Sequence, residues 1–377
     1  MGIKFCDCEN DGFCPRYNRD MGGRMREICA GINVDLGTSA AFREQWSRES
    51  RPVSTNTIMT PQPLLLKNNQ APGDAVAMTA AIYSLHRAYP GRYVTIVESK
   101  WPDVFDHNPD VPAHIPPDPH HRTTVSGMSE VLMHYPAVHR SNERGIHFMQ
   151  GWCEFLGMAL GIQVPLLTNR PRIYFPGPQP PTENFWIICG GGKSDFTNKL
   201  WGWQRYQDVV GKLYGKVRFI QVGECREDHP PLRGVESMVG GTTLRQLFDL
   251  VRRARGVLCG VSLLMHVAAA LEKPSVVIAG GREPVQWNAY PKQQYLHTVG
   301  ALPCRDTEGN IGGACWRYRV KPLKENPELN TCLCERPVRD TPECMTMIRS
   351  ETVVEAVLRY DWQYGNDNAT NRQQLHP

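Results

Sequence analysis

The residues best suited to chemistry stand in one short segment, 260–271, where glycine and serine come directly before an apolar, alanine-rich helical pattern. An apolar run precedes the segment, and another follows Pro274. We expect Ser262 to cap the helix, with His266 one turn inside it. A strand, a turn and a helix in this order direct helix-terminal N–H groups at a diphosphate. The segment favours an α/β enzyme that handles a nucleotide, although His266 also fits a buried, hydrogen-bonded core histidine.

An acidic residue and two lysines stand at comparable turns. Asp74 follows Gly73 at the start of an apolar helical pattern. Its carboxylate could cap that helix, act as a general base, or do both. Lys193 and Lys199 follow a glycine turn after a strand-like run. Either lysine could neutralise a leaving diphosphate, or it could be an ordinary solvated loop residue. The glycine spacing before Lys193 does not match a P-loop.

Thirteen cysteines are many for a chain whose N-terminus does not resemble a secretory signal. In a reducing compartment, clustered cysteines bind metal more often than they form disulfides. The late cluster predicts one four-thiolate site, with two close cysteines competing for one ligand position. The early cluster predicts a second such site. The late cluster is Cys304, Cys315, Cys332, Cys334 and Cys344, and the early one is Cys6, Cys8, Cys14 and Cys29.

Strands alternating with helices must position these residues. Strand-like runs at 93–97, 185–189, 217–222, 256–259 and 276–279 are separated by helical patterns that include 148–160 and 244–253. Residues 101–125 are predicted to form a loop, and residues 350–360 a last helix. Such alternation predicts parallel sheets, and a proline-rich stretch at 165–181 divides it in two. The fold class we expect is α/β, with two doubly wound Rossmann-like domains facing a cleft and cysteine-rich metal-binding appendages.

Composition limits the function classes. The chain has 377 residues, which suggests more than one domain, and its 41% hydrophobic and 21% charged residues are typical of a soluble globular protein. No apolar run is long enough to predict a membrane span. The net charge of +4 does not by itself indicate nucleic-acid binding. We expect a cytoplasmic protein and leave an oligomer open.

Several short motifs, in their order along the chain, resemble glycosyltransferase family 9, the ADP-heptose heptosyltransferases. The motifs are Gly73-Asp74, Lys199-Leu-Trp201, Gln221-Val-Gly-Glu224, Ser262-Leu-Leu-Met-His266 and Gly280-Gly-Arg-Glu-Pro284 with Trp287 and Tyr290-Pro291. The segment 134–142 and the cysteines after Leu302 are similar to autotransporter heptosyltransferases, which carry a four-cysteine iron finger. The resemblance covers about residues 60–362 and implies a GT-B fold.

The resemblance also implies roles. Asp74 matches the family's catalytic base, and no catalytic metal is implied. The expected donor-binding residues are Lys193, Thr197, Lys199, Glu224, Ser262, His266 and Arg282. The family usually has aspartate where this chain has Val261, so an acidic contact is lost there. The cysteine sites would hold structural iron, although a tetrahedral thiolate set also permits zinc.

We therefore expect an inverting glycosyltransferase that moves a heptose-like sugar from a nucleotide-diphosphate sugar to a hydroxyl of a saccharide or protein acceptor. Two alternatives remain: a sugar transferase acting on modified DNA bases or another non-saccharide acceptor, and a non-catalytic binding protein with the GT-B fold. The expected domains are a cysteine-rich prefix (1–55), an acceptor domain (56–170), a nucleotide-sugar domain (171–300), a metal finger (301–348) and a C-terminal helix and tail (349–377).

Overall fold

The computed structural model describes the chain in segments: residues 60–117, 128–133, 145–192, 197–226, 229–304, 314–315, 317–322 and 333–373, with side chains as far as residue 363, and the backbone of 13–14 and 19–20. The chain divides into two compact units, one of residues 1–59 and 322–332 and the other of residues 60–321 and 333–377. The first contains one short antiparallel pair, β1 (Phe13–Cys14) and β2 (Arg19–Asp20). Everything below concerns the second unit.

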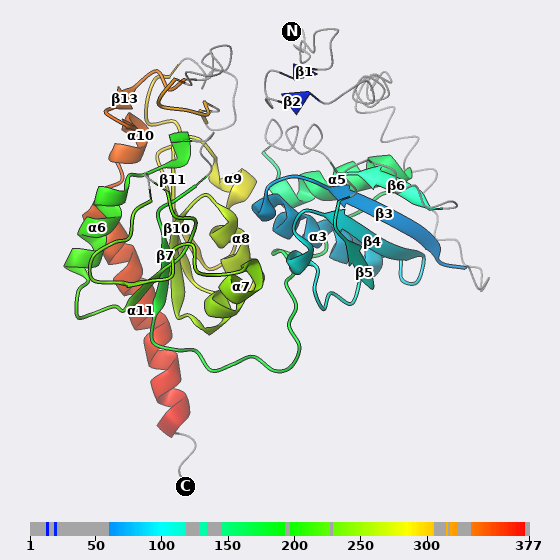
Figure 1. The fold of residues 1–377 in the computed structure, drawn as a ribbon, viewed down its shortest axis with the longest axis horizontal. Helices are drawn as coiled ribbons and strands as arrows, with labels where there is room; N and C mark the ends of the chain where they lie inside the picture. The colour runs from blue at the N-terminus through cyan, green and yellow to red at the C-terminus, as the bar shows by residue number, and fades with distance from the viewer. Residues whose placement is uncertain are drawn as a thin grey trace. The chain divides into compact units, whose positions relative to one another are not determined.

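A six-stranded parallel sheet organises the C-terminal half (Figure 1). Its spatial order, β12-β11-β10-β7-β8-β9, means that the chain starts in the middle, builds outward to one edge, and then returns to build toward the other. The reversal lies between β7 and β10, which pair directly. Ligands of doubly wound folds bind at this switch point, beyond the carboxyl ends of the strands. The strands are β7 (Trp186–Cys189), β8 (Phe219–Gln221), β9 (Glu236–Ser237), β10 (Gly256–Gly260), β11 (Ser275–Gly280) and β12 (Gln293–His297).

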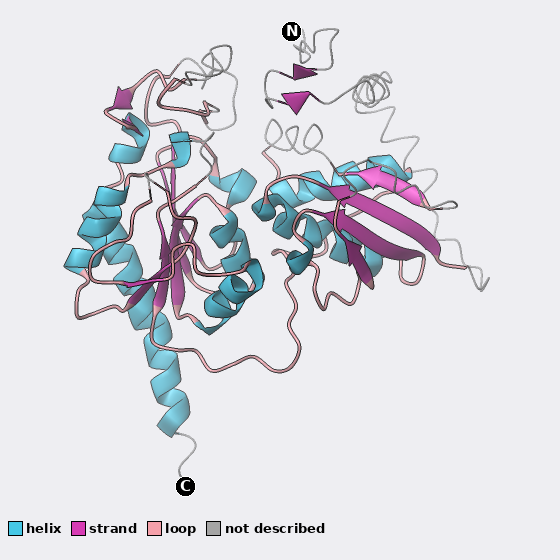
Figure 2. Cartoon of the chain, in the orientation of Figure 1, coloured by secondary structure: helices cyan, strands magenta, loops and turns pink. Residues whose placement is uncertain are grey.

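Helices cover both faces of this sheet, as Figure 2 shows. Alternate residues of one strand enter different apolar cores: Val257 packs with α7 and α8, whereas Leu258 packs with α6 and α11. Burial on both faces explains why β7, β10 and β11 are almost continuously apolar. The helices are α6 (Trp203–Lys212), α7 (Leu244–Arg253), α8 (Leu263–Ala270), α9 (Val285–Asn288), α10 (Glu343–Thr346) and α11 (Ser350–Gln373).

A smaller parallel sheet of four strands, in the order β5-β4-β3-β6, precedes the larger one. Here too the chain reverses direction beside its first strand, because β3 pairs with both β4 and β6. The elements are β3 (Gln62–Asn68), α3 (Pro72–Ala88), β4 (Tyr93–Ser99), the 3₁₀ turn η1 (Pro102–Val104), β5 (Ala113–Ile115), β6 (Ser129–Leu132) and α5 (Phe148–Leu160). The α/β fold with parallel sheets is thus as the sequence predicts.

The connection between the sheets is anchored by stacking. Two guanidinium groups lie over the ring of Phe175, with the Arg245 carbon 4.1 Å and the Arg252 carbon 4.5 Å from the ring centroid. Arg245 also donates to the carbonyl of Tyr174 and, at 3.3 Å, to that of Asp103. The proline-rich stretch is therefore fastened to α7 and to η1.

Some elements differ from the sequence-based expectation. The loop expected at 101–125 contains η1 and β5, and strand β12 was missed, because its half-buried residues lack a clear apolar alternation. The last helix, expected at 350–360, continues to Gln373. No helix in the described part of the chain combines the length and hydropathy that crossing a bilayer requires.

Candidate functional site

Asp74 lies in the first turn of α3, at the carboxyl end of β3. The helix begins at Pro72 with Ala71 as its N-cap, so Asp74 is the third helical residue and not the cap itself. Its Oδ2 accepts the Ala71 N–H at 3.1 Å, which closes the helix start. The side chain is only half-buried, so the structural role of this carboxylate does not remove it from solvent.

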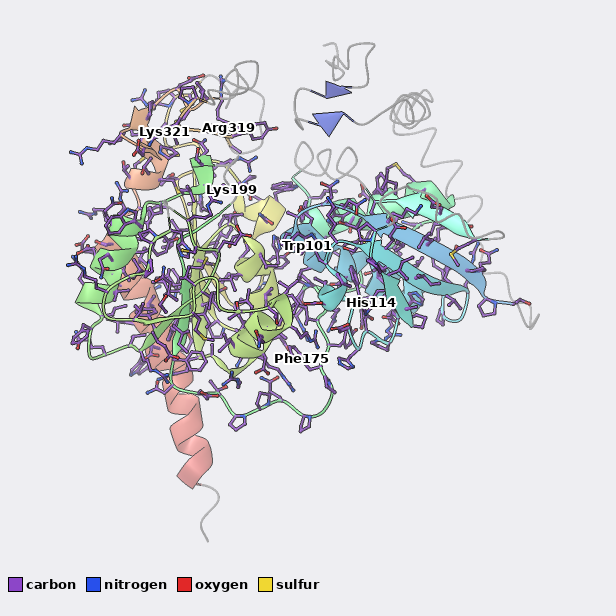
Figure 3. The ribbon with its side chains drawn as sticks, in the orientation of Figure 1. Trp101, His114, Phe175, Lys199, Arg319 and Lys321 are labelled. Atoms are coloured by element: carbon purple, nitrogen blue, oxygen red, sulfur yellow. The ribbon has the colours of Figure 1, made fainter. Side chains whose placement is uncertain are left out.

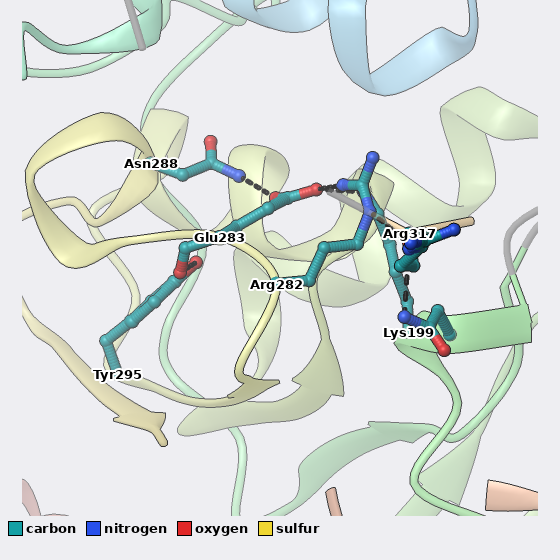
Figure 4. Close-up of polar contacts among 7 residues, drawn as sticks. Lys199, Arg282, Glu283, Asn288, Tyr295 and Arg317 are labelled. Carbon is teal, nitrogen blue, oxygen red and sulfur yellow. Dashed lines mark hydrogen bonds and ion pairs between the residues drawn. The ribbon is translucent and has the colours of Figure 1, made fainter. Parts of the chain in front are cut away.

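Lys199 belongs to a buried cluster of charges that follows β7 and β11 (Figure 4). Its Nζ lies 2.6 Å from Oε1 of Glu283, whose side chain is 3% exposed, while the Lys199 side chain is 25% exposed. Arg282 donates to the same carboxylate oxygen, and Asn288 Nδ2 donates to Oε2 at 2.6 Å. Two cations and an amide thus hold one buried carboxylate.

Burial and pairing act in opposite directions on this cluster. Burial alone would raise the pKa of Glu283, but the charges of Lys199 and Arg282 outweigh it and lower that pKa, so the carboxylate is ionised. Burial lowers the pKa of Lys199, and Glu283 and Asp74 only partly offset this shift. A further anion beside Lys199 would favour its protonated form.

His266 is a buried, hydrogen-bonded histidine. Its Nδ1 lies 2.8 Å from the hydroxyl of Tyr290, and burial lowers the pKa of His266 to about 3, so the ring is neutral. Gly73 lies against this ring: a Cβ at Gly73 would be 3.1 Å from His266 Cδ2 and 3.4 Å from Cα of Leu263. The missing side chain lets the first turns of α3 and α8 approach closely, which brings Asp74 toward the end of the larger sheet.

Ser262 precedes α8, but the expected cap bond does not form. Its backbone is extended, and its hydroxyl accepts no N–H from the helix. The third helical N–H, from Met265, instead bonds the Ser262 carbonyl at 3.2 Å. This outcome corrects the prediction of a serine cap, and it leaves the first N–H groups of α8 without a capping side chain among the described residues. Val261, at the position of the usual family aspartate, is buried.

Four of the expected donor-binding residues follow neighbouring strands of the larger sheet. Glu224 comes after β8, Lys199 after β7, Ser262 after β10, and Arg282 after β11, directly before Glu283. The four strands are adjacent in this order, and all are parallel. Lys199 and Ser262 therefore flank the switch point, with Glu224 to one side and Glu283 to the other.

Glu224 is exposed, and a histidine that sequence reasoning missed fixes its turn. His229 is 2% exposed, and its Nδ1 lies 3.1 Å from the carbonyl of Glu224. The Gly190 N–H donates to its Nε2 at 3.3 Å, which assigns the proton to Nδ1. A Cβ at Gly223, whose φ is +124°, would be 2.9 Å from the same ring. His229 thus ties together the turns that follow β7 and β8.

The 3₁₀ turn η2 (Thr197–Lys199) is supported by residues 317–321. The hydroxyl of Thr197 accepts the Val320 N–H at 3.1 Å, and the Asn198 N–H donates to the Tyr318 carbonyl at 3.0 Å. Thr197 therefore holds in place the 3₁₀ turn that carries Lys199. Figure 3 labels Arg319 in this supporting segment; it is 5% exposed. Lys193 lies outside the described residues.

Four of the late cysteines line a single cavity of about 20 Å³. They come from three separated segments, and Cys315 is joined to the larger sheet by its N–H, which donates to the Gly281 carbonyl at 2.8 Å. Burial raises the pKa of the Cys315 thiol to about 11, and the three other thiols add to this shift. Burial also raises the pKa of the remaining thiols. The four are Cys304, Cys315, Cys334 and Cys344.

Only some of the remaining cysteines that the sequence predicted as ligands lie among the described residues. Of the two competing cysteines, Cys334 lies at the cavity and Cys332 is outside the described residues. No set of three or more cysteine, histidine or acidic side chains among the described residues has the arrangement of a bound metal site. The early cluster also falls outside the described side chains; it comprises Cys6, Cys8, Cys14 and Cys29.

Residues 185–311 match the model of glycosyltransferase family 9 (heptosyltransferase). This segment runs from β7 through β12, and it contains Lys199, Glu224, Ser262 and His266. The chain is therefore a glycosyltransferase that carries a family 9 domain in its larger sheet. No curated protein matches the chain by sequence.

Solved structures share the fold at low sequence identity. The iron-containing dodecameric glycosyltransferase TibC of enterotoxigenic E. coli H10407 is 15% identical, with a TM-score of 0.55, over 81% of this chain and 78% of that one. The E. coli ADP-heptose LPS heptosyltransferase II is 13% identical, with a TM-score of 0.52, over 80% and 99%. A family 9 glycosyltransferase of Veillonella parvula is 13% identical, with a TM-score of 0.54, over 82% and 100%. The likeness extends across both parallel sheets.

Proposed function

We propose that the chain is an inverting glycosyltransferase that transfers a heptose-like sugar from a nucleotide-diphosphate sugar to an acceptor hydroxyl. The observation that carries this proposal is the position of Lys199 and the start of α8 on either side of the switch point of a family 9 domain. TibC has been solved with ADP-D-beta-D-heptose, which supports an ADP-sugar as the donor class. The acceptor would be a saccharide or a protein.

The proposed chemistry is a single displacement. Asp74 takes the proton of the acceptor hydroxyl, the acceptor oxygen forms a bond to the anomeric carbon, and the bond from that carbon to the diphosphate oxygen breaks. The electron pair leaves on the diphosphate. Lys199 and the uncapped N–H groups at the start of α8 stabilise the charge that develops there.

The electrostatic coupling around Lys199 supports this assignment. Asp74 is near enough to raise the pKa of Lys199 and that of Tyr290, so the proposed base lies within range of the proposed diphosphate site. Transfer to DNA bases would favour a basic surface, whereas the net charge of the chain is only +4.

Mass spectrometry of the purified protein with a panel of nucleotide sugars tests the function. We expect release of the nucleoside diphosphate, by transfer or slow hydrolysis, from one ADP-sugar of the panel, and about 10²–10⁴-fold less from the Asp74→Asn variant. Identical release by both proteins would assign the base elsewhere. No release from any donor, despite binding of the nucleoside diphosphate, would favour the non-catalytic alternative.

We further propose that Cys304, Cys315, Cys334 and Cys344 hold one structural iron or zinc ion. Four thiols that line a single small cavity are a donor set suited to either metal. Bound metal would keep the thiolates ionised, although burial alone raises their pKa values. The ion would fasten the residues around Cys334 to the end of β11, beside the segment that supports η2.

Elemental analysis of protein purified without added metal should find about one ion for this site. Cys334→Ser should lose that ion and lower the melting temperature. Cys225→Ser, which changes an exposed cysteine away from the cavity, is the matched control and should change neither. Metal-free protein whose four thiols react freely, with an unchanged melting temperature, would refute the site.

A further inference from the structure

Asn288, the last residue of α9, has a buried acceptor that no described residue satisfies. The residue is 4% exposed, and its Oδ1 has no hydrogen-bond partner in the part of the chain that the structure describes. The amide orientation is not interchangeable. Nδ2 faces Oε2 of Glu283 at 2.6 Å, and turning the amide over would set oxygen against an ionised carboxylate. Figure 4 shows the amide oxygen turned away from Glu283. A buried acceptor of this kind destabilises the protein until it receives a donor.

The surroundings of Asn288 are fixed from both sides. The carbonyl of Ala289, the next residue, accepts a hydrogen bond of 3.2 Å from Nε2 of His147, which is the N-cap of α5. The hydroxyl of Tyr290, the following residue, is hydrogen-bonded to Nδ1 of His266 at 2.8 Å. These contacts fix the backbone that follows Asn288, and the bond from Nδ2 to Glu283 holds its side chain, so turning the amide toward another partner would break that bond.

The position of Asn288 along the sheet edge identifies the part of the donor that would meet it. A single carboxylate, that of Glu283, separates its amide from Lys199 Nζ. Asn288 lies on the β11 side of the switch point, whereas Glu224 lies on the β8 side. It also lies two residues from Tyr290, which is within electrostatic range of Asp74. The transferred sugar must lie between the diphosphate and the base, because its anomeric carbon reacts there.

We propose that Asn288 is a specificity-determining residue whose Oδ1 accepts a hydrogen bond from a hydroxyl of the transferred sugar. The inference rests on the proposed function, and it assigns recognition of the sugar to a side chain outside the expected donor set. Glu283 has a positioning role in it: one carboxylate orients both Lys199, for the diphosphate, and Asn288, for the sugar. A donor that lacks this hydroxyl leaves the acceptor unsatisfied, and a site built around a hydrogen bond discriminates strongly against such a donor.

The test compares each donor with its deoxy analogues within one protein. The probes are the ADP-sugar that the wild type turns over, its single-deoxy analogues in the sugar, and its 2′-deoxyribose analogue. For the wild type, we expect one sugar-deoxy analogue to lose about 10- to 100-fold in kcat/KM. For Asn288→Ala, kcat/KM with the intact donor should fall to a similar extent. The ratio of kcat/KM for the intact donor to kcat/KM for that analogue should therefore approach one. A general loss of structure cancels in this ratio.

Binding of ADP alone, measured by calorimetry, should differ by less than about threefold between the two proteins, since Asn288 is assigned to the sugar. If Asn288→Ala still discriminates every sugar hydroxyl as the wild type does, Asn288 is not the recognising group. If discrimination is lost only at the ribose, the assignment to the transferred sugar is wrong. If the wild type turns over none of the nucleotide sugars, the proposed function itself fails.

Discussion

Replacing Lys199 by methionine removes one of the two cations around the carboxylate of Glu283. The lost ion pair spans 2.6 Å, and the Glu283 side chain is 3% exposed. Breaking a fully buried pair costs about 3–5 kcal/mol, because it leaves an uncompensated charge. Here Arg282 and Asn288 still bond the carboxylate, so we expect a smaller loss of unfolding free energy, about 1.5–3 kcal/mol, the contribution of one hydrogen bond to a charged group. Denaturant unfolding measures it.

The same substitution should weaken binding of a nucleoside diphosphate. A charge-assisted contact in a dry site is worth about 2–4 kcal/mol, which corresponds to roughly 30- to 1,000-fold in Kd by calorimetry. A double variant separates the two effects. Adding Glu283→Gln to Lys199→Met removes the buried carboxylate that has lost one of its two cations, and it should recover part of the stability but not the affinity.

The pH dependence gives an independent reading of the same residue. Burial lowers the pKa of Lys199 below its ordinary 10.5, and the protonated form is the one that binds an anion. Affinity for the nucleoside diphosphate should therefore fall as the pH rises through that lowered pKa. A Lys199→Arg variant remains charged and should show a flat profile over this range. Equal affinity for wild type and Lys199→Met, or recovery of affinity in the double variant, would refute the assignment of Lys199 to the diphosphate.

Further predictions concern other parts of the site. Asp74→Asn keeps an oxygen for the helix start, so ADP affinity and stability should change little while single-turnover transfer falls; parallel losses of all three would mean that Asp74 is structural. Gly73→Ala sets a methyl group 3.1 Å from His266 Cδ2 and should slow transfer about 3- to 10-fold at unchanged ADP affinity; calorimetry and kinetics together test this, and wild-type kinetics would contradict it. His229→Ala removes a buried ring and its hydrogen bonds to Gly190 and Glu224, and it should cost about 2–4 kcal/mol in denaturant unfolding and weaken ADP binding; an unchanged Kd would show that the turns do not need it. Burial lowers the pKa of His266 to about 3 and that of His147 to about 4, so the unfolded protein binds more protons than the folded protein below pH 6.5. The free energy of unfolding should therefore fall from pH 6.5 toward 4 by up to about 1.4 kcal/mol per pH unit for each histidine. A flat stability profile over that range would argue against their burial.

Sequence patterns predicted the framework well because the larger sheet is buried on both faces. Fully apolar runs such as those of β7, β10 and β11 can be read without knowing the partners of each strand. Helices α5 and α7 have the bounds that their apolar periodicity predicts, residues 148–160 and 244–253. The edge strand β12 escaped detection because it is only partly buried and therefore lacks such a run.

The site could be predicted only where a residue has a recognisable place in a motif. Glu283 stands beside Arg282 in the glycine-rich segment that the sequence singled out, yet only the arginine was expected to act. What makes Glu283 central is its 2.6 Å contact with Lys199, a residue more than eighty positions earlier, and spacing in sequence carries no sign of such a contact. His229 is a similar case, because its ring accepts from Gly190, which follows a different strand of the sheet.

The order of strands also explains why contacts to the different parts of one donor can be tested separately. From β8 to β11 the sheet edge spans three strand spacings, about 14 Å at the usual separation of neighbouring strands. A free monosaccharide is too short to reach from Glu224 to Asn288, whereas an extended nucleoside diphosphate sugar can cross the switch point with its charged centre near Lys199. Substitutions at different places along this edge should then affect different parts of the same donor. Loss of Lys199 should be felt by a nucleoside diphosphate alone, and loss of Asn288 should be felt only when the sugar is attached.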